Sequence, residues 1–146
     1  MYKNKVIPYL MVRNGKEALE FYKKVFSATI GEVMYADKIP GQENNENAKK
    51  TIIHAPLTIN GNTIFLADAN TNSNSEQNLT VFGNNIALCL LYGNKEKQKT
   101  TYDLLKANSS KIIMELMDTF WGDTFGVIED KYGITWQLTY NEKYNS

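Results

Sequence analysis

The sequence is poor in several residue types that mark common protein classes. Its 146 residues include one cysteine and one histidine, and Arg13 is the only arginine. A single cysteine cannot build an internal disulfide framework, and Cys89 lies in the apolar run 86–91, where we expect a buried, unreactive thiol. Sixteen basic and sixteen acidic residues leave no net charge. We therefore expect neither nucleic acid nor a membrane surface as a partner.

Long apolar runs and common catalytic motifs are also missing. No apolar segment approaches the ~20 residues of a membrane-spanning helix, and the chain enters a predicted strand at once, without room for a signal peptide. These features favour a cytoplasmic protein. The sequence contains no P-loop, dinucleotide fingerprint, Gly-x-Ser-x-Gly motif or Cys-x-x-Cys pair. Nucleotide-dependent, hydrolase and redox functions therefore lack support.

The residue pattern of the first half predicts the element order β-α-β-β-β. Strands are expected over 6–12, 29–37, 51–59 and 63–68, with a helix over 15–26. Pro8 removes a hydrogen-bond donor, which places the first strand at a sheet edge or Pro8 near the strand's start. Asn14 and Glu17 resemble a capping box before the helix. The pair Asn60-Gly61 is a strong hairpin signal.

The same order recurs after a polar linker. Strands are expected over 85–92, 111–117, 125–129 and 134–140, with a helix over 95–108 that Asn94 caps. The turn residue Gly133 is expected at positive φ. Because 61–66 resembles 133–138, we predict one domain over 1–146 made of two similar halves, about 4–69 and 83–141, with any site between them.

Several short segments, in this order and spacing, carry a family resemblance. They are Ile7-Pro8-Tyr9-Leu10, Ala18-Leu19-Glu20-Phe21-Tyr22, Ile53-His54-Ala55, Trp121-Gly122, and the stretch from Asp130 to Leu138. The chain resembles the vicinal oxygen chelate superfamily of glyoxalases, bleomycin-resistance proteins and dioxygenases, and within it the PhnB-like branch. The resemblance implies an α+β fold in which two βαβββ modules form curved mixed sheets around a cavity, commonly in a homodimer. The edge strand marked by Pro8 also favours pairing between chains.

The resemblance further implies a divalent metal held by His, Gln or Glu on the first and last strands of the modules. The residues near those positions are Tyr9, Phe65, Asn85 and Gln137. Divalent first-row metals prefer imidazole, thiolate or carboxylate ligands, which this set lacks. We therefore predict a degenerate metal site and no cofactor. If a divalent metal binds, the candidate ligands are His54, Gln137 and Glu129.

Strand alternation, the ends of predicted strands and the positions implied by the family resemblance together supply the candidate ligand-binding residues. Alternation places His54 with Ile52, Pro56 and Thr58, opposite Ile53, Ala55, Leu57 and Ile59. His54 is then either a pocket residue or a structural histidine. Arg13 is expected either to bind an anionic group of a ligand or to be solvated. Asp68 is expected either to contact a ligand or to face water. Core packing explains Trp136 and, unless it lines the cavity, Trp121. The predicted ligand-binding set is Tyr9, His54, Phe65, Asp68, Trp121 and Gln137.

Two function classes follow. The first is a small-molecule binding protein with an aromatic-lined cavity for an apolar or planar metabolite or drug. The alternative is a divalent-metal-dependent lyase, isomerase or dioxygenase-like enzyme built on nonstandard ligands. A methyltransferase activity, sometimes attached to the PhnB-like branch by name, is the weakest option, because no glycine-rich cofactor loop follows a strand.

Overall fold

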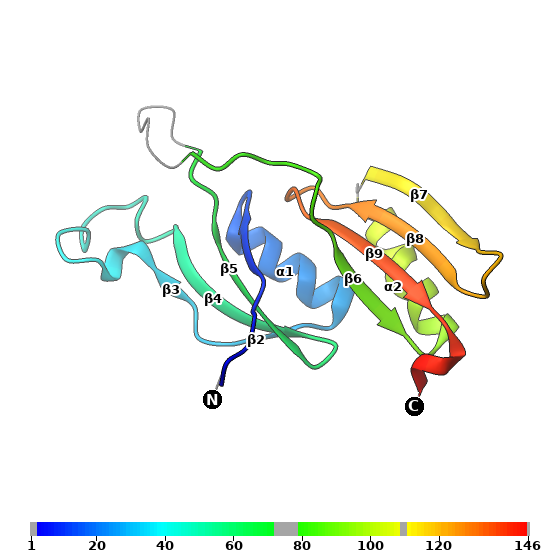
Figure 1. Ribbon diagram of the computed structural model, residues 1–146. Coiled ribbons are helices and arrows are strands. Elements are labelled where there is room, and N and C mark those ends of the chain that lie inside the picture. The colour runs from blue at the N-terminus through cyan, green and yellow to red at the C-terminus, as the bar shows by residue number, and fades with distance from the viewer. Residues whose placement is uncertain (1–2, 72–78, 109–110, 146) are drawn as a thin grey trace. The chain divides into compact units, whose positions relative to one another are not determined.

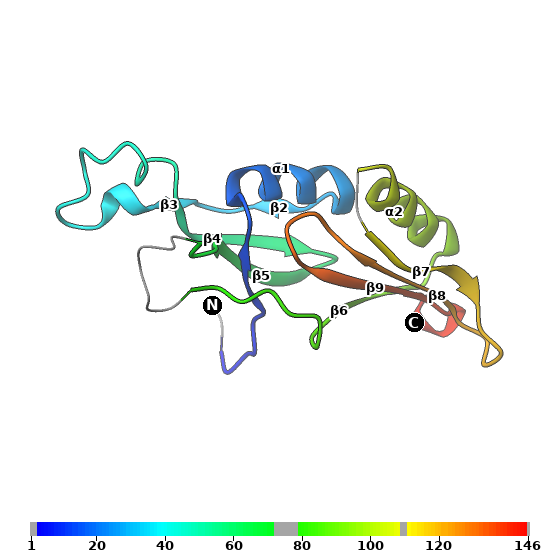
Figure 2. The same cartoon turned by 90° about the horizontal axis from the view of Figure 1, so that it is seen from above.

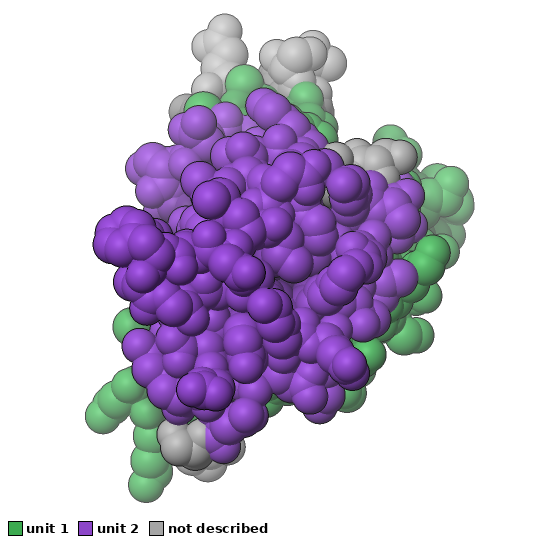
Figure 3. Space-filling view, turned by 90° about the vertical axis from the view of Figure 1, so that its right-hand side faces the viewer, with its two compact units in different colours: residues 1–81 green, residues 82–146 purple. Residues whose placement is uncertain are grey.

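The computed structural model describes residues 3–71, 79–108 and 111–145. The chain divides into two compact units, residues 1–81 and 82–146, coloured separately in Figure 3. The boundary falls in the interval expected to separate the two halves. In the part of the chain that the structure describes, no helix is long and apolar enough to cross a membrane.

The first unit is a mixed sheet with one helix (Figure 1). Its elements are β1 (Tyr9–Val12), α1 (Gly15–Phe26), β2 (Thr29–Ile30), β3 (Met34–Tyr35), a 3₁₀ turn (Ala36–Lys38), β4 (Ile52–Ile59) and β5 (Asn62–Asp68). The strand order is β1-β5-β4-β2, and β3 also pairs with β4. Only β1 pairs in parallel, with β5. Strand β1 lies at the sheet edge and begins directly after Pro8, as predicted.

The single strand predicted over 29–37 is two short strands, because the pairing with β4 changes register between them. Ile30 pairs with Leu57 and Met34 with His54, so four steps along one strand match three along the other. One extra residue in a strand is a β-bulge, which bends the chain and interrupts the ladder. With β2 and β3 counted together, the first unit has the predicted βαβββ order.

Helix α1 forms where the capping pattern predicts it. The Asn14 side chain accepts a hydrogen bond from the Glu17 amide at 3.3 Å, and its own amide group donates to Glu17 Oε2 at 2.9 Å. These bonds satisfy a donor that the first helical turn leaves free. The apolar residues that recur at helical spacing along α1 are buried: Ala18, Leu19, Tyr22, Val25 and Phe26. Helix α1 therefore covers one face of its sheet (Figure 2).

The second unit repeats the order with an unbroken set of strands. Its elements are β6 (Leu88–Tyr92), α2 (Lys95–Ala107), β7 (Lys111–Asp118), β8 (Thr124–Glu129), β9 (Thr135–Tyr140) and a 3₁₀ turn (Glu142–Asn145). The strand order is β6-β9-β8-β7, with β6 parallel to β9. In both units the first strand pairs in parallel with the last. The predicted α+β fold of two βαβββ modules is confirmed.

A buried glutamine that the sequence pattern did not reveal anchors α2. Gln98 is fully buried and donates from Nε2 to the carbonyl oxygens of Thr124, at 2.8 Å, and Leu138, at 3.0 Å. These bonds tie α2 to β8 and β9 on the face that also buries Trp136. Helix α2 has few apolar residues on its inward face, so the sequence does not indicate that the polar side chain of Gln98 is buried there.

The two hairpin turns confirm the glycine predictions. Asn60 and Gly61 have φ of 48° and 77°, the left-handed pair that a two-residue hairpin requires, and Gly133 has φ of 95°. A buried carboxylate closes the last turn. Asp130 accepts hydrogen bonds from the Ile134 amide at 3.0 Å and from Trp136 Nε1 at 2.8 Å.

Three burial predictions are wrong. Strand β6 alternates, so Leu90 and Tyr92 are buried whereas Cys89 is exposed on the opposite face. Ile52 is buried on the helix side, not beside His54. Its Cδ1 lies 3.3 Å from the position a Cβ on Gly15 would take. The register irregularity opposite β3 explains this reversal. Trp121, taken as a core residue in one interpretation, is 59% exposed.

Candidate functional site

The face of the first sheet opposite α1 carries a group of aromatic and sulfur-containing side chains. Leu10 and Val12 of β1 are buried toward the helix, and Ala55 and Leu57 of β4 are buried likewise. Since successive strand residues point to opposite faces, the residues between and beside these lie on the other side. We call this set the open face: Tyr9, Met11, Met34, His54, Pro56 and Phe65.

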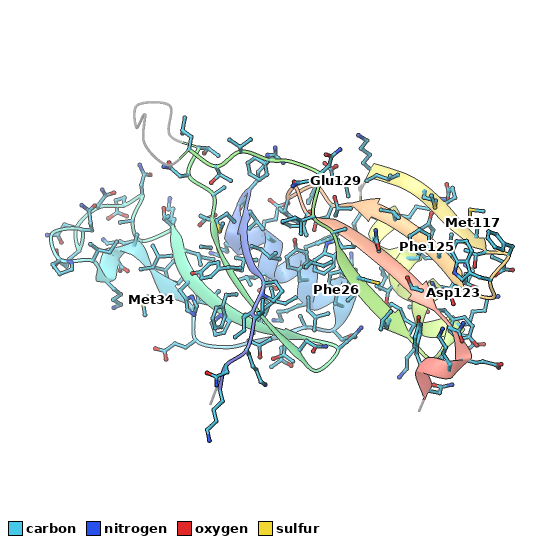
Figure 4. All side chains as sticks on the ribbon, viewed as in Figure 1. Phe26, Met34, Met117, Asp123, Phe125 and Glu129 are labelled. Atoms are coloured by element: carbon cyan, nitrogen blue, oxygen red, sulfur yellow. The ribbon has the colours of Figure 1, made fainter. Side chains whose placement is uncertain are left out.

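Sheet register brings the open face together from four strands. Tyr9 of β1 pairs with Phe65 of β5, which also pairs with Pro56 of β4. Met34 of β3 pairs with His54 of β4, and Figure 4 labels Met34 near the end of the sheet away from β1. Residues far apart in sequence, such as Tyr9 and His54, which are 45 positions apart, therefore become neighbours.

Three rings at the centre of the open face form an aromatic cluster: Tyr9, His54 and Phe65. The His54 and Phe65 ring centroids are 4.6 Å apart at an interplanar angle of 67°, and those of Tyr9 and Phe65 are 5.7 Å apart at 73°. Tyr9 and His54 are 5.6 Å apart and tilted by 56°. Edge-to-face arrangements of this kind stabilise ring pairs beyond the burial of their area.

A hydrogen bond network fixes the polar side of the aromatic cluster. The Tyr9 hydroxyl donates to the Ile53 carbonyl oxygen at 3.1 Å and lies 2.9 Å from His54 Nδ1. Burial raises the pKa of the Tyr9 phenol above its ordinary value of 10.0. The phenol is therefore protonated at neutral pH, and the imidazole ring is held in one orientation.

The open face is accessible to solvent although its side chains are largely apolar. Tyr9, Met11 and Met34 are 42%, 47% and 48% exposed, and His54 and Phe65 are half-buried. Scattered exposed apolar residues are ordinary, but a contiguous group on one sheet face marks an interaction surface. The flexible methionines beside the rings can adapt to the shape of a bound molecule.

Asp68, predicted to bind a ligand, lies on the helix side of the first unit. Its carboxylate accepts hydrogen bonds from the amides of Gly15, at 2.5 Å, and Ile52, at 2.7 Å. These contacts join the start of α1 to β4 and β5. A hollow of about 490 Å³ adjoins them, lined by Val12, Arg13, Asn14, Lys50, Thr51, Asp68, Ala69 and Thr71.

Trp121 lies in the loop between β7 and β8 of the second unit. Its indole Nε1 donates to Asp123 Oδ2 at 2.8 Å, and its ring packs edge-on against Phe120 with centroids 4.8 Å apart. Hydrogen bonds from Asn141 and Trp121 lower the pKa of Asp123. Figure 4 labels Asp123 beside Met117 and Phe125, which pair across β7 and β8.

Gln137 faces away from α2 in the second sheet. Trp136 and Leu138 on either side of it are fully buried, and Gln137 pairs with Cys89 and Val127. Glu129 pairs with Thr135 next to the turn of the β8–β9 hairpin, two residues along from the pair of Val127 and Gln137. The candidate set therefore divides between units: Tyr9, His54, Phe65 and Asp68 belong to the first, and Trp121, Glu129 and Gln137 to the second.

The donor set around the only histidine does not fit a divalent metal. His54 contacts the rings of Tyr9 and Phe65, neither of which supplies a carboxylate or thiolate. Among residues 3–71, 79–108 and 111–145, no three His, Cys, Asp or Glu side chains form a group suited to a metal ion. A transition-metal site usually takes three or four such donors.

Two βαβββ units, each pairing its first strand in parallel with its last, define a glyoxalase-like α+β protein. The chain belongs to the Glyoxalase/Bleomycin resistance protein/Dioxygenase superfamily, whose model matches residues 6–138.

Several known proteins are similar to this chain, and one of them is described as a PhnB protein. The sequence is 28% identical to Protein YjdN of Escherichia coli (strain K12) over 141 residues, which cover 90% of this chain and 91% of that protein. The structure is similar to a putative 3-demethylubiquinone-9 3-methyltransferase, PhnB protein, from Bacillus cereus, with a TM-score of 0.74, 29% identity and coverage of 94% and 100%. Protein PA1353 from Pseudomonas aeruginosa shares the fold, with a TM-score of 0.75, 20% identity and coverage of 95% and 98%.

Proposed function

We propose that the protein binds a small, planar, largely apolar molecule on the open face of the first sheet. The observation that carries this proposal is the aromatic cluster on the side away from α1, in which Phe65 of β5 packs edge-to-face against Tyr9 of β1 and His54 of β4. Small-molecule sites typically combine apolar and aromatic walls with a few placed polar groups. Here Phe65 supplies the wall, and Tyr9 and His54 supply the polar groups.

The residues present favour binding over metal-dependent catalysis. The lyase, isomerase or dioxygenase-like alternative needs a set of metal ligands, and the rings around His54 do not provide one. The methyltransferase description belongs to the Bacillus cereus protein, and this sequence has no glycine-rich loop after a strand to hold a nucleotide-like cofactor. We therefore propose a degenerate metal site in a binding protein.

The proposal also includes a homodimer. Strand β7 is at the edge of its sheet, and three of its apolar side chains are exposed, namely Ile113, Met114 and Met117. Edge strands with apolar side chains are ordinarily covered by another element or chain. A second copy of this chain is the occupant that accords with the usual symmetry of soluble proteins.

Calorimetric titration with 2-naphthol, a planar probe of suitable size, tests the binding site. We expect Phe65→Ala to weaken the affinity at least fivefold, since it removes the edge-to-face partner of both other rings. The control is Phe120→Ala, which removes an aromatic side chain that is 98% exposed in the second unit. Equal affinities of wild type and Phe65→Ala, or a loss confined to Phe120→Ala, would place binding elsewhere.

A further inference from the structure

The Tyr9 hydroxyl has one proton and two polar neighbours, the Ile53 carbonyl oxygen and His54 Nδ1. This arrangement determines which nitrogen of the His54 imidazole carries the proton. We infer that His54 carries its proton on Nδ1 and presents an unprotonated Nε2, which accepts a hydrogen bond from a planar ligand bearing an O–H or N–H donor. This inference rests on the proposed function and names the chemical class of the ligand.

The first step concerns the Ile53 carbonyl. A carbonyl oxygen can only accept, so at 3.1 Å the Tyr9 hydroxyl donates its single proton to Ile53 O. The contact of 2.9 Å between the Tyr9 oxygen and His54 Nδ1 then needs its proton from the histidine. In a neutral imidazole, a proton on Nδ1 leaves Nε2 as a lone-pair acceptor.

The second step concerns the surroundings of Nε2. Within the described part of the chain, the His54 side chain has no hydrogen-bond partner other than Tyr9. Its ring packs edge-to-face with Phe65 and at a tilt to Tyr9. An acceptor nitrogen beside aromatic walls discriminates between ligands. A donor is bound by the nitrogen, whereas an analogue without a donor leaves it unpaired on contact with an apolar surface.

These features select phenols, indoles and aromatic lactams over ethers and pure hydrocarbons. All three classes combine a planar ring, suited to the aromatic cluster, with one O–H or N–H donor at the ring edge. The Tyr9 hydroxyl is also required. It donates to the Ile53 carbonyl oxygen, and its own oxygen accepts the hydrogen bond from His54 Nδ1–H, so Tyr9→Phe removes the acceptor that keeps the proton on Nδ1.

The imidazole protonation is directly measurable because His54 is the only histidine. A ¹⁵N long-range correlation spectrum then contains a single imidazole. We expect wild type to show a protonated Nδ1 and a bare Nε2, and Tyr9→Phe to shift the population toward the Nε2–H form that free imidazoles prefer. A wild-type spectrum with the proton on Nε2 would overturn the inference without touching the proposed function.

A matched pair of probes tests the ligand class. The compounds 2-naphthol and 2-methoxynaphthalene share one ring system and differ in the O–H donor. We expect wild type to bind 2-naphthol about two- to tenfold more tightly, which is the worth of one hydrogen bond. His54→Phe keeps a ring but removes the acceptor, and we expect it to bind both probes with similar affinity.

The outcomes separate the two proposals. Equal binding of both probes by wild type would overturn the donor requirement and leave the binding site intact. Binding of neither probe would contradict the proposed function itself. A preference for 2-naphthol that persists in His54→Phe would assign the acceptor to another residue, and Tyr9→Phe supplies an independent variant if His54→Phe does not fold.

Discussion

Tyr102 links α2 to strand β7 through a charged hydrogen bond. Its ring is buried, and its hydroxyl donates to Glu115 Oε2, while Lys106 Nζ lies 3.4 Å from Glu115 Oε1. Burial and the Glu115 carboxylate raise the pKa of Tyr102 to about 12. The hydrogen bond from Tyr102 and the nearby Lys106 lower the pKa of Glu115.

This pKa predicts a loss of stability in alkali. The folded protein holds the Tyr102 proton more tightly than the unfolded chain, whose phenols titrate near 10. The contribution is therefore fully present below pH 10 and is lost as the pH rises toward 12. We expect the free energy of unfolding, measured in urea, to fall more steeply over this range in wild type than in Tyr102→Phe. A control variant, Tyr144→Phe, should follow wild type. Parallel curves for wild type and Tyr102→Phe would contradict the assignment.

The turn of the β4–β5 hairpin requires a left-handed backbone conformation at Gly61. A Cβ added at Gly61 would meet nothing within 4 Å, yet its φ is 77°. At Gly83 a Cβ would meet only Asn85 Oδ1, at 3.4 Å, and φ lies outside the left-handed region. Both glycines have space for a side chain. They differ in backbone conformation, because only Gly61 adopts the left-handed conformation that strains a residue with a side chain.

We expect Gly61→Ala to lower the free energy of unfolding by about 1 kcal/mol, because an L-residue in the left-handed region is strained. Gly83→Ala should change it by less than about 0.5 kcal/mol. Urea titrations of both variants provide the measurement. Equal effects of the two substitutions would show that the turn does not constrain the hairpin.

Local patterns predict the elements well, and long-range pairing accounts for what they miss. Helix α1 begins and ends at the predicted residues because its cap and apolar stripe are local in sequence. The split of the strand predicted over 29–37 depends on its register with β4, which no short window contains. The exposure of Cys89 likewise follows from which side of the second sheet α2 covers.

The candidate site follows the same division. The sequence names Tyr9 and His54 because alternation along a strand assigns each to a face, and it names Phe65 through the position that the family resemblance implies. Their mutual contacts, and the addition of Met34 opposite His54, follow from pairing among β1, β3, β4 and β5. The hydrogen bonds of Asp68 to backbone amides have no sequence signature.

At the level of the assembly, we expect a dimer in solution. Light scattering at micromolar concentration should give twice the 16.6 kDa mass of one chain, since exposed apolar edge residues such as Met117 favour pairing. Met117→Lys, which places a charge on this edge, should raise the monomer fraction. A single species of one chain mass at all concentrations would contradict the homodimer.

The methionines report directly on where a ligand binds. Met11 and Met34 lie on the open face of the first sheet, whereas Met114 and Met117 lie on β7 of the second. We propose to label the methionine methyl groups with ¹³C and to add 2-naphthol. The account predicts that the Met11 and Met34 signals shift and saturate, and that Phe65→Ala abolishes the shift at the same probe concentration. Shifts confined to Met114 and Met117, or shifts of Met11 and Met34 that persist in Phe65→Ala, would contradict a binding site on the open face.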